Sequence, residues 1–161
     1  MTMQNATQAD APATFEAFYE QHKTWAIRFA WLMVREAAAA EDISHDAFTR
    51  VFERFDTLTN PSAYLRSTLT NAVYERSRRT GREERRLRLV SAGESTQVEH
   101  ASGGMMDAIS RLPIRQRTAV VLRYWVDLPV DDIAEAMSAR PGTVKSWLSR
   151  ANAQLRKEIE P

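Results

Sequence analysis

The sequence predicts an all-α protein made of two small helical domains joined by a flexible linker. Apolar residues recur at helical intervals of three and four along most of the chain, and strand-like alternation is absent. This periodicity stops at residues 80–104, where a charged run mixes with Gly and Ser, so this segment is the expected linker, with an extension of the preceding helix into its first part as the alternative. The predicted domains are therefore residues 14–79 and 105–161, and the small polar residues at 1–13 predict a disordered N-terminus.

Three helices are expected in the N-terminal domain. A stripe that includes Phe18, Trp25 and Phe29 predicts the first helix at Phe15–Val34. The second is expected at about residues 39–55, with acidic and polar side chains opposite its apolar stripe. The third is expected at 61–79, because the pair Asn-Pro at residues 60 and 61 is typical of an N-cap followed by proline at the first helical position.

The C-terminal domain is expected to contain four short helices, at residues 105–111, 114–125, 130–137 and 141–158. The last two, with the tight connection between them, have the layout of a helix-turn-helix, although ordinary helical hairpins share it. In such a motif the second helix lies in the major groove of DNA, with its N-terminal residues at base edges. The predicted base-reading residues are Arg140, Thr143, Lys145, Ser146, Ser149 and Arg150.

The charge of the chain is unevenly distributed, although its net value is only +1. Residues 61–90 carry eight Lys/Arg against three Asp/Glu, and residues 140–161 carry five against two; both other parts of the chain are acidic. Two separated basic blocks indicate two places that meet a polyanion, with acidic surfaces left for other partners. The alternative is that both blocks are solvated helix faces.

The third predicted helix combines aromatic and basic residues on the side opposite its apolar stripe. Aromatic rings can stack on exposed bases, arginines neutralise phosphates, and asparagine can pair with a base edge. This face suits single-stranded or partly melted DNA, and a solvated helix with two tyrosines at its edge is the alternative. Its residues are Tyr64, Asn71, Tyr74, Glu75, Arg78 and Arg79.

Several classes of protein have little support. The chain has no cysteine, and its three histidines are too scattered for metal-ligand spacing, so no metal or cofactor is expected. No nucleophile with a base and no glycine-rich phosphate loop is present, so an enzyme is not expected. The sequence lacks a span of membrane length and a signal-peptide pattern, so a cytoplasmic protein without membrane contact of its own is expected.

Three ordered motifs together resemble a bacterial RNA polymerase sigma factor of the extracytoplasmic-function (ECF) group. These are AEDISHDAF at residues 40–48, AYLRSTLTNAVYERSRR at 63–79, and the stretch that begins LPIRQR and runs over 112–156. The resemblance implies that residues 14–79 form sigma region 2, which binds core RNA polymerase and melts the minus-10 promoter element. It also implies that residues 105–161 form region 4, which recognises the minus-35 element.

The resemblance assigns roles by position. The family's polymerase-clamp surface corresponds to Asp42, His45, Asp46, Thr49 and Glu53, and its promoter-melting helix to Asn71, Glu75, Arg78 and Arg79. Its recognition helix corresponds to residues 140–150, and its loop that captures a flipped base to residues 54–62. An anti-sigma protein that covers the polymerase-binding surface is a further expectation.

The sequence departs from the family at five positions: His45 for glutamine, Glu75 for aspartate, Ser138 for the glycine of the turn, Arg140 for a serine cap, and Trp147 for a basic residue. The last three prevent transfer of a promoter sequence. Trp147 borders both faces of its helix and is expected to pack against the preceding helices rather than touch a base.

The predicted function is an alternative sigma factor that directs promoter-specific transcription initiation. A helix-turn-helix regulator of the ordinary kind is the main alternative, but it leaves the second and third helices without a task. Another alternative is a degenerate adaptor that binds polymerase or an anti-sigma protein without melting DNA. The predicted partners are therefore core RNA polymerase, promoter DNA and an anti-sigma factor.

Overall fold

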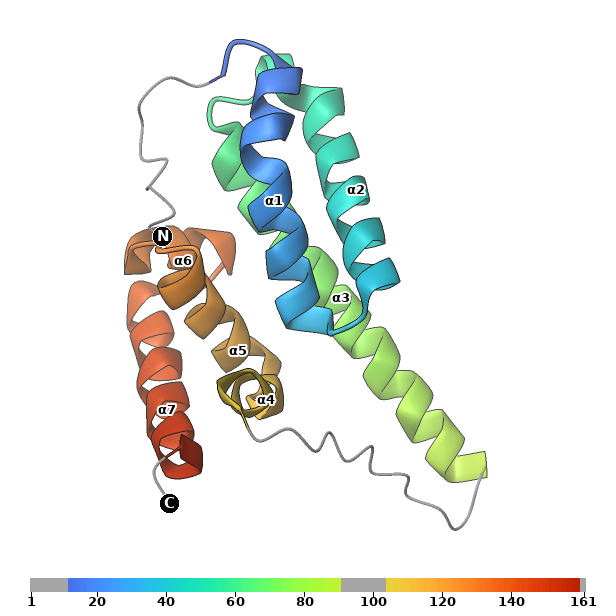
Figure 1. Ribbon diagram of the computed structural model, residues 1–161, viewed down its shortest axis with the longest axis vertical. Helices are drawn as coiled ribbons and strands as arrows, with labels where there is room; N and C mark the ends of the chain where they lie inside the picture. Colours follow the sequence, from blue (N-terminus) through green and yellow to red (C-terminus); the bar gives the residue numbers. More distant parts are fainter. Residues whose placement is uncertain (1–11, 91–103, 160–161) are drawn as a thin grey trace.

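A computed structural model describes residues 12–90 and 104–159, and all regular structure in these residues is helical. This confirms the all-α prediction. Seven α-helices in the described residues follow one another in the order that the periodicity predicts, three within residues 12–90 and four within residues 104–159 (Figure 1). The expected N-terminal disorder and most of the expected linker lie outside the described residues. Within the described ranges no helix is long and apolar enough to cross a membrane.

The first three helices pack side by side. They are α1 (Phe15–Val34), α2 (Ala37–Arg54) and α3 (Pro61–Val90), with a short 3₁₀ turn, η1 (Phe55–Thr57), after α2. Asn60 caps α3 as expected: its side-chain oxygen accepts a hydrogen bond from the Ala63 amide at 3.0 Å. Large apolar side chains from all three helices, such as Phe18, Val51 and Leu65, are fully buried between them.

The last four helices pack on one another, and their buried apolar residues belong to the same hydrophobic cluster as those of the first three helices. They are α4 (Met105–Arg111), α5 (Ile114–Val120), α6 (Val130–Ala136) and α7 (Pro141–Ile159), and α5 continues into a π-helical turn, η2 (Val121–Trp125). Leu112, Leu122, Ile133 and Val144 are almost completely buried and join the helices to one another. The helix-turn-helix layout is present in α6 and α7.

The turn between α6 and α7 places Ser138 in the left-handed region, with φ of 49°. Its amide donates to the Glu135 carbonyl at 3.1 Å, and the next amide, of Ala139, donates to the Ala134 carbonyl at 2.9 Å. These two bonds satisfy carbonyls at the end of α6, which is the usual function of a left-handed residue after a helix. Serine therefore occupies a position whose backbone favours glycine.

Helix α3 continues beyond residue 79 to Val90, which is the alternative that the sequence left open for the first part of the expected linker. Arg, Glu and Leu dominate residues 82–89 and are strong helix formers, and Glu84 and Arg88 stand four residues apart, the spacing at which opposite charges support a helix. Gly81 opposes the helix by only about 1 kcal/mol. The first part of the expected linker is therefore helical.

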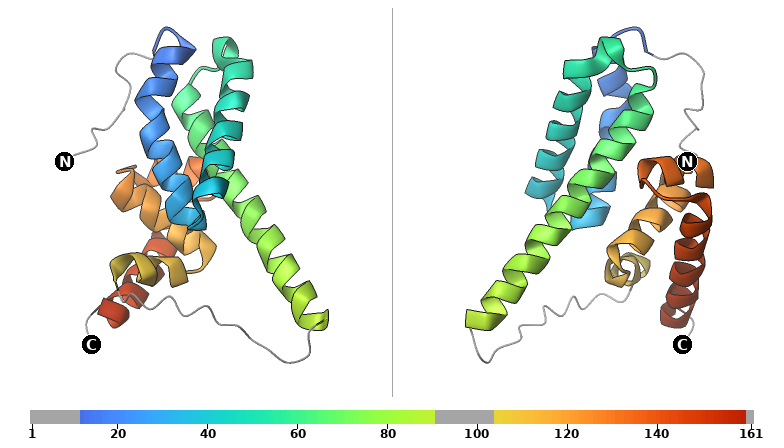
Figure 2. Two further views of the ribbon diagram at one scale, coloured as in Figure 1. Left: turned by 45° about the vertical axis from the view of Figure 1, so that its right-hand side comes forward. Right: turned by 180° about the vertical axis from the view of Figure 1, so that it is seen from behind.

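The two groups of helices are in contact. Helix α3 packs against α5 and α6, and α1 approaches α4 and α5 (Figure 2). The Arg117 guanidinium of α5 donates a hydrogen bond to the Met33 carbonyl near the end of α1 at 2.9 Å. In this structure α3 is thus covered on one side by its own domain and on another by the C-terminal helices.

Candidate nucleic-acid interface

The five residues predicted to face the polymerase lie along the exposed side of α2. Ile43, Ala47 and Val51 on the opposite side of the helix are buried, so the amphipathic pattern orients the polar set outward. The Thr49 hydroxyl donates to the His45 carbonyl one turn earlier at 3.0 Å. All five are exposed: Asp42, His45, Asp46, Thr49 and Glu53.

A hollow of about 450 Å³ between α2 and α3 joins this surface to the predicted promoter-melting helix. Asp42 and Asp46 line it from α2, and Asn71, Glu75 and Arg79 line it from α3. Two residue sets that were predicted for different partners therefore form one continuous surface. A second hollow, of about 390 Å³, lies between α1 and α2 and is lined by His45.

The exposed row of α3 carries Asn71, Glu75, Arg78 and Arg79. The Arg79 guanidinium pairs with the Glu75 carboxylate at 3.2 Å, and both side chains are well exposed. An exposed ion pair contributes little to stability, so Arg79 can exchange this partner for a phosphate at small cost. Tyr64, one of the two predicted stacking rings, is half-buried beneath the Arg54 guanidinium, 5.4 Å from the ring centre.

Tyr74, the other predicted stacking ring, does not lie on this exposed row. Its relative exposure is 5%, and the Arg115 guanidinium of α5 lies 4.6 Å from the centre of its ring. Burial raises the pKa of the Tyr74 phenol. The expected exposure of Tyr74 was therefore wrong for this structure, because the C-terminal helices cover that side of α3.

Helix α7 has the two faces that its sequence predicts. Val144, Leu148, Ala151 and Leu155 are buried in the domain core. The opposite face is exposed and carries the predicted base-reading residues Arg140, Thr143, Lys145, Ser146, Ser149 and Arg150. Trp147 is half-buried, with the Arg115 guanidinium 5.7 Å from its ring centre, in agreement with the prediction that it packs on earlier helices.

His22 of α1 fixes the start of α3, next to the turn at residues 54–62. Its Nδ1 lies 2.8 Å from the Phe18 carbonyl, which can only accept, so this nitrogen carries the proton. Nε2 is then free to accept from the Ser62 hydroxyl at 2.9 Å. Burial lowers the pKa of His22, the hydrogen bond to the Phe18 carbonyl raises it in part, and the nearby Arg66 charge lowers it again. The net effect lowers the pKa and favours the neutral ring that this pair of bonds needs.

Sequence reasoning missed Arg66, Arg115 and Arg117 as contacts between the two groups of helices. One signal was present: Arg66, Thr70 and Tyr74 are spaced four apart, which places them on one face of a helix beside the recognised apolar stripe. In the described part of the chain no group of three or more His, Cys, Asp or Glu side chains is arranged to hold a metal ion.

Each of the two groups of helices matches a known protein family. Residues 18–83 match the family Sigma-70 region 2, and residues 103–155 match the family Sigma-70, region 4. The chain therefore belongs to the sigma-70 family of RNA polymerase sigma factors.

Individual relatives place the chain within this family. It is 32% identical over 152 residues to the RNA polymerase sigma-E factor of Streptomyces avermitilis, which covers 91% of this chain and 85% of that one. It is 31% identical over 149 residues to the ECF RNA polymerase sigma factor SigM of Mycobacterium tuberculosis, covering 88% and 74%. The chain is thus a sigma factor of the ECF group.

Solved structures show the same fold. The sigma factor RpoE of Bartonella quintana, solved with the anti-sigma factor NepR, has a TM-score of 0.73 at 24% identity, covering 91% of this chain and 96% of that one. CnrH, solved with the cytosolic domain of CnrY, has a TM-score of 0.66 at 18% identity, covering 91% and 87%.

Proposed function

We propose that this protein is an alternative sigma factor that binds core RNA polymerase and directs it to a specific set of promoters. The observation that carries the proposal is the division of polar surfaces over the sigma fold. An acidic surface on α2 continues into the exposed row of α3, and a separate basic face lies on α7. Two separate surfaces fit a partner that contains both polymerase and DNA. When both surfaces engage one complex, neither surface needs high affinity by itself.

The residue roles follow from chemistry and position. The α2 set contacts the polymerase clamp, the α3 row holds the melted minus-10 strand through Asn71, Arg78 and Arg79, and the exposed face of α7 binds the minus-35 element. The protein positions DNA and polymerase, performs no reaction of its own and acts in the cytoplasm. An anti-sigma protein that covers the α2 surface would prevent polymerase binding without touching α7.

Run-off transcription tests the proposal. Purified core polymerase is incubated with a genomic promoter library in the presence and absence of this protein, and new transcripts with defined start sites are expected only when it is present. A control protein with Asp42→Arg and Asp46→Arg, which reverses the charge of the α2 surface, should give few of these transcripts. Repression of existing transcripts without new ones would instead identify an ordinary helix-turn-helix regulator.

A further inference from the structure

The turn at residues 54–62, between α2 and α3, is held at both of its ends by α1. Near its start, the Phe55 ring packs against the Phe18 ring, with 5.6 Å between the ring centres. At its end, the Ser62 hydroxyl donates to Nε2 of His22 at 2.9 Å. Phe18 and His22 are one helical turn apart, so a single turn of α1 determines where this connection lies.

Hydrogen bonds within the turn fix its backbone. The Leu58 amide donates to the Arg54 carbonyl at 3.1 Å, and the Thr57 hydroxyl donates to the same carbonyl at 2.9 Å. The turn therefore moves as one unit, and its two attachments to α1 set its position.

The turn adjoins the α3 surface that was assigned to the minus-10 strand. The Arg54 guanidinium lies 5.4 Å from the centre of the Tyr64 ring on α3, and the side chains of Asp56 and Thr59 are exposed. A guanidinium can bind a phosphate, and short polar side chains can pair with the edge of a base. Such hydrogen bonds need defined distances and angles, so base recognition here depends on the position of the turn.

His22 is a costly residue for its surroundings. Its relative exposure is only 4%, and its ring stacks on the Phe18 ring at 4.1 Å between the centres. An apolar side chain would fill this space without the cost of removing two ring nitrogens from water. One nitrogen bonds within α1, to the Phe18 carbonyl, and only Nε2 reaches another element, through Ser62. The polarity of His22 thus provides a directional link between α1 and the start of α3.

We propose that His22 is a positioning residue for minus-10 recognition, because its bond to Ser62 holds the turn at residues 54–62 where the turn can bind a base of the melted strand. The proposal rests on the function proposed above and adds a residue that touches neither DNA nor polymerase. A histidine that only fills the core would affect the amount of folded protein, and hence all promoters equally. A positioning residue instead changes the preference among minus-10 sequences.

Run-off transcription with core polymerase and a pool of templates measures this preference. The template is one promoter that the wild-type protein directs, with only its minus-10 element randomised. The preference is the ratio of transcripts from the favoured base to those from the other bases at the most selective position. Ser62→Ala should lower this ratio about three- to tenfold, because the hydrogen bond that positions the turn is lost. The ratio is measured within one reaction, so it does not depend on the amount of folded variant.

Two variants of His22 identify the atom responsible. His22→Gln carries an amide oxygen at about the reach of Nε2, which can accept from the Ser62 hydroxyl. His22→Asn is shorter, so it keeps a donor for the Phe18 carbonyl and lacks the acceptor for Ser62. The glutamine variant should retain most of the preference, and the asparagine variant should lose as much as Ser62→Ala. Combining His22→Asn with Ser62→Ala should lower the ratio no further, because both changes remove the same bond.

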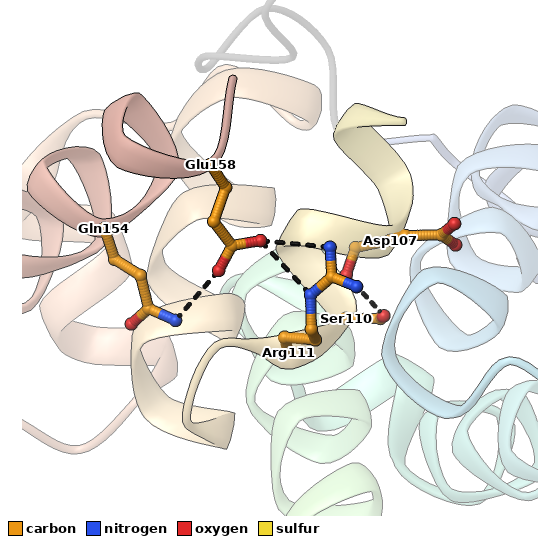
Figure 3. Close-up of polar contacts among 5 residues, drawn as sticks. All are labelled: Asp107, Ser110, Arg111, Gln154 and Glu158. Atoms are coloured by element: carbon orange, nitrogen blue, oxygen red, sulfur yellow. Dashed lines mark hydrogen bonds and ion pairs between the residues drawn. The ribbon is translucent and has the colours of Figure 1, made fainter. Parts of the chain in front are cut away.

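Ser110→Ala is the matched control. Ser110 is a half-buried serine of α4, and its hydroxyl donates to the Asp107 carbonyl at 2.7 Å, among the C-terminal helices (Figure 3). Its replacement removes the same atom and one hydrogen bond, and it should leave the minus-10 preference unchanged. In a second pool, randomised only at the minus-35 element, all of these variants should keep the wild-type preference.

Two results would overturn the role of His22. One is an unchanged minus-10 preference in Ser62→Ala, and the other is an equal loss in His22→Gln and His22→Asn. Failure of the sigma-factor function looks different, because the wild-type protein itself would then give no new transcripts.

Discussion

At the scale of the residue, Ser138 shows how a departure from the family pattern is accommodated. Its φ of 49° places an L side chain in a backbone region where it costs roughly 1–2 kcal/mol. Replacing it by glycine removes this strain. Glycine also adds freedom to the unfolded chain, which offsets part of the gain. Ser138→Gly should therefore raise the free energy of unfolding by about 0.5–1 kcal/mol. Urea unfolding followed by circular dichroism measures this. Ala153→Gly, at an exposed helical position of α7, should instead lower it by about 1 kcal/mol, and a decrease in both variants would contradict the strain argument.

His22 predicts a dependence of stability on pH. Burial lowers its pKa in the folded protein, so the unfolded chain binds more protons around and below the ordinary value of about 6.5. The stability associated with neutral His22 is therefore present above that pH and is lost as the pH falls through the lowered folded-state pKa. Two groups of α3 act on the His22 ring. The Arg66 charge opposes its protonation, and the Ser62 hydroxyl hydrogen-bonds to its Nε2.

Urea unfolding between pH 7.5 and 5.5 measures this effect. The free energy of unfolding of the wild type should decline toward acid, and His22→Gln should flatten the decline. Ser62→Ala removes only the hydrogen bond to Nε2, so it should lower stability at pH 7.5 by about 0.5–1.5 kcal/mol and keep most of the pH dependence. An equal slope in the wild type and His22→Gln would show that this histidine is not responsible.

At the scale of the element, α3 supports a prediction about salt. Arg78 and Arg79 are exposed next to Asn71 on the row assigned to the minus-10 strand. Removing one arginine–phosphate interaction should reduce the slope of log affinity against log salt by about 0.9 on duplex DNA, or about 0.7 on a single strand. Arg78→Ala with Arg79→Ala should therefore weaken promoter opening at low salt and make it less sensitive to added salt.

Open-complex formation with core polymerase, measured over a range of salt concentrations, checks this prediction. The double variant Arg28→Ala with Lys157→Ala removes the same charge from exposed positions of α1 and α7 that the proposal does not use. It should leave the salt slope close to that of the wild type. If both double variants behave alike, net charge rather than the α3 row determines promoter opening.

At the scale of the whole molecule, the sequence predicts what depends on local spacing. The order of the seven helices, the Asn60 cap, the outward face of α2 and the two faces of α7 follow from periodicity and capping chemistry. The sequence left the end of α3 open between residue 79 and the first part of the linker, because Gly81 and the following charges resemble a linker. The residues after Gly81 are strong helix formers, and the structure continues the helix to Val90.

Features that join distant parts of the chain were not predictable from periodicity. Tyr74 is covered by Arg115, which lies forty-one residues later in the chain. The apolar pattern of α3 does not indicate that helices from the other domain will cover part of its polar side. The same limit applies to Arg117 and its hydrogen bond to the end of α1. The candidate site was therefore predicted as three separate faces, whereas the structure joins two of them through a hollow and covers part of the third helix.

Because α3 is long, a small rotation of the helix moves its C-terminal end over a larger distance. Its thirty residues span about 45 Å, and the arginine-rich end beyond Gly81 projects past the other helices (Figure 1). Arg88 lies roughly 28 Å along the axis from the buried Leu69, so tilting α3 by about 10° about that point would move this arginine by roughly 5 Å. The buried part of α3 in the hydrophobic core would be the pivot of this tilt. A small tilt about the buried Leu65 and Leu69 would thus carry the tip of the helix farther than the axial distance between neighbouring phosphates of one DNA strand, about 3.4 Å.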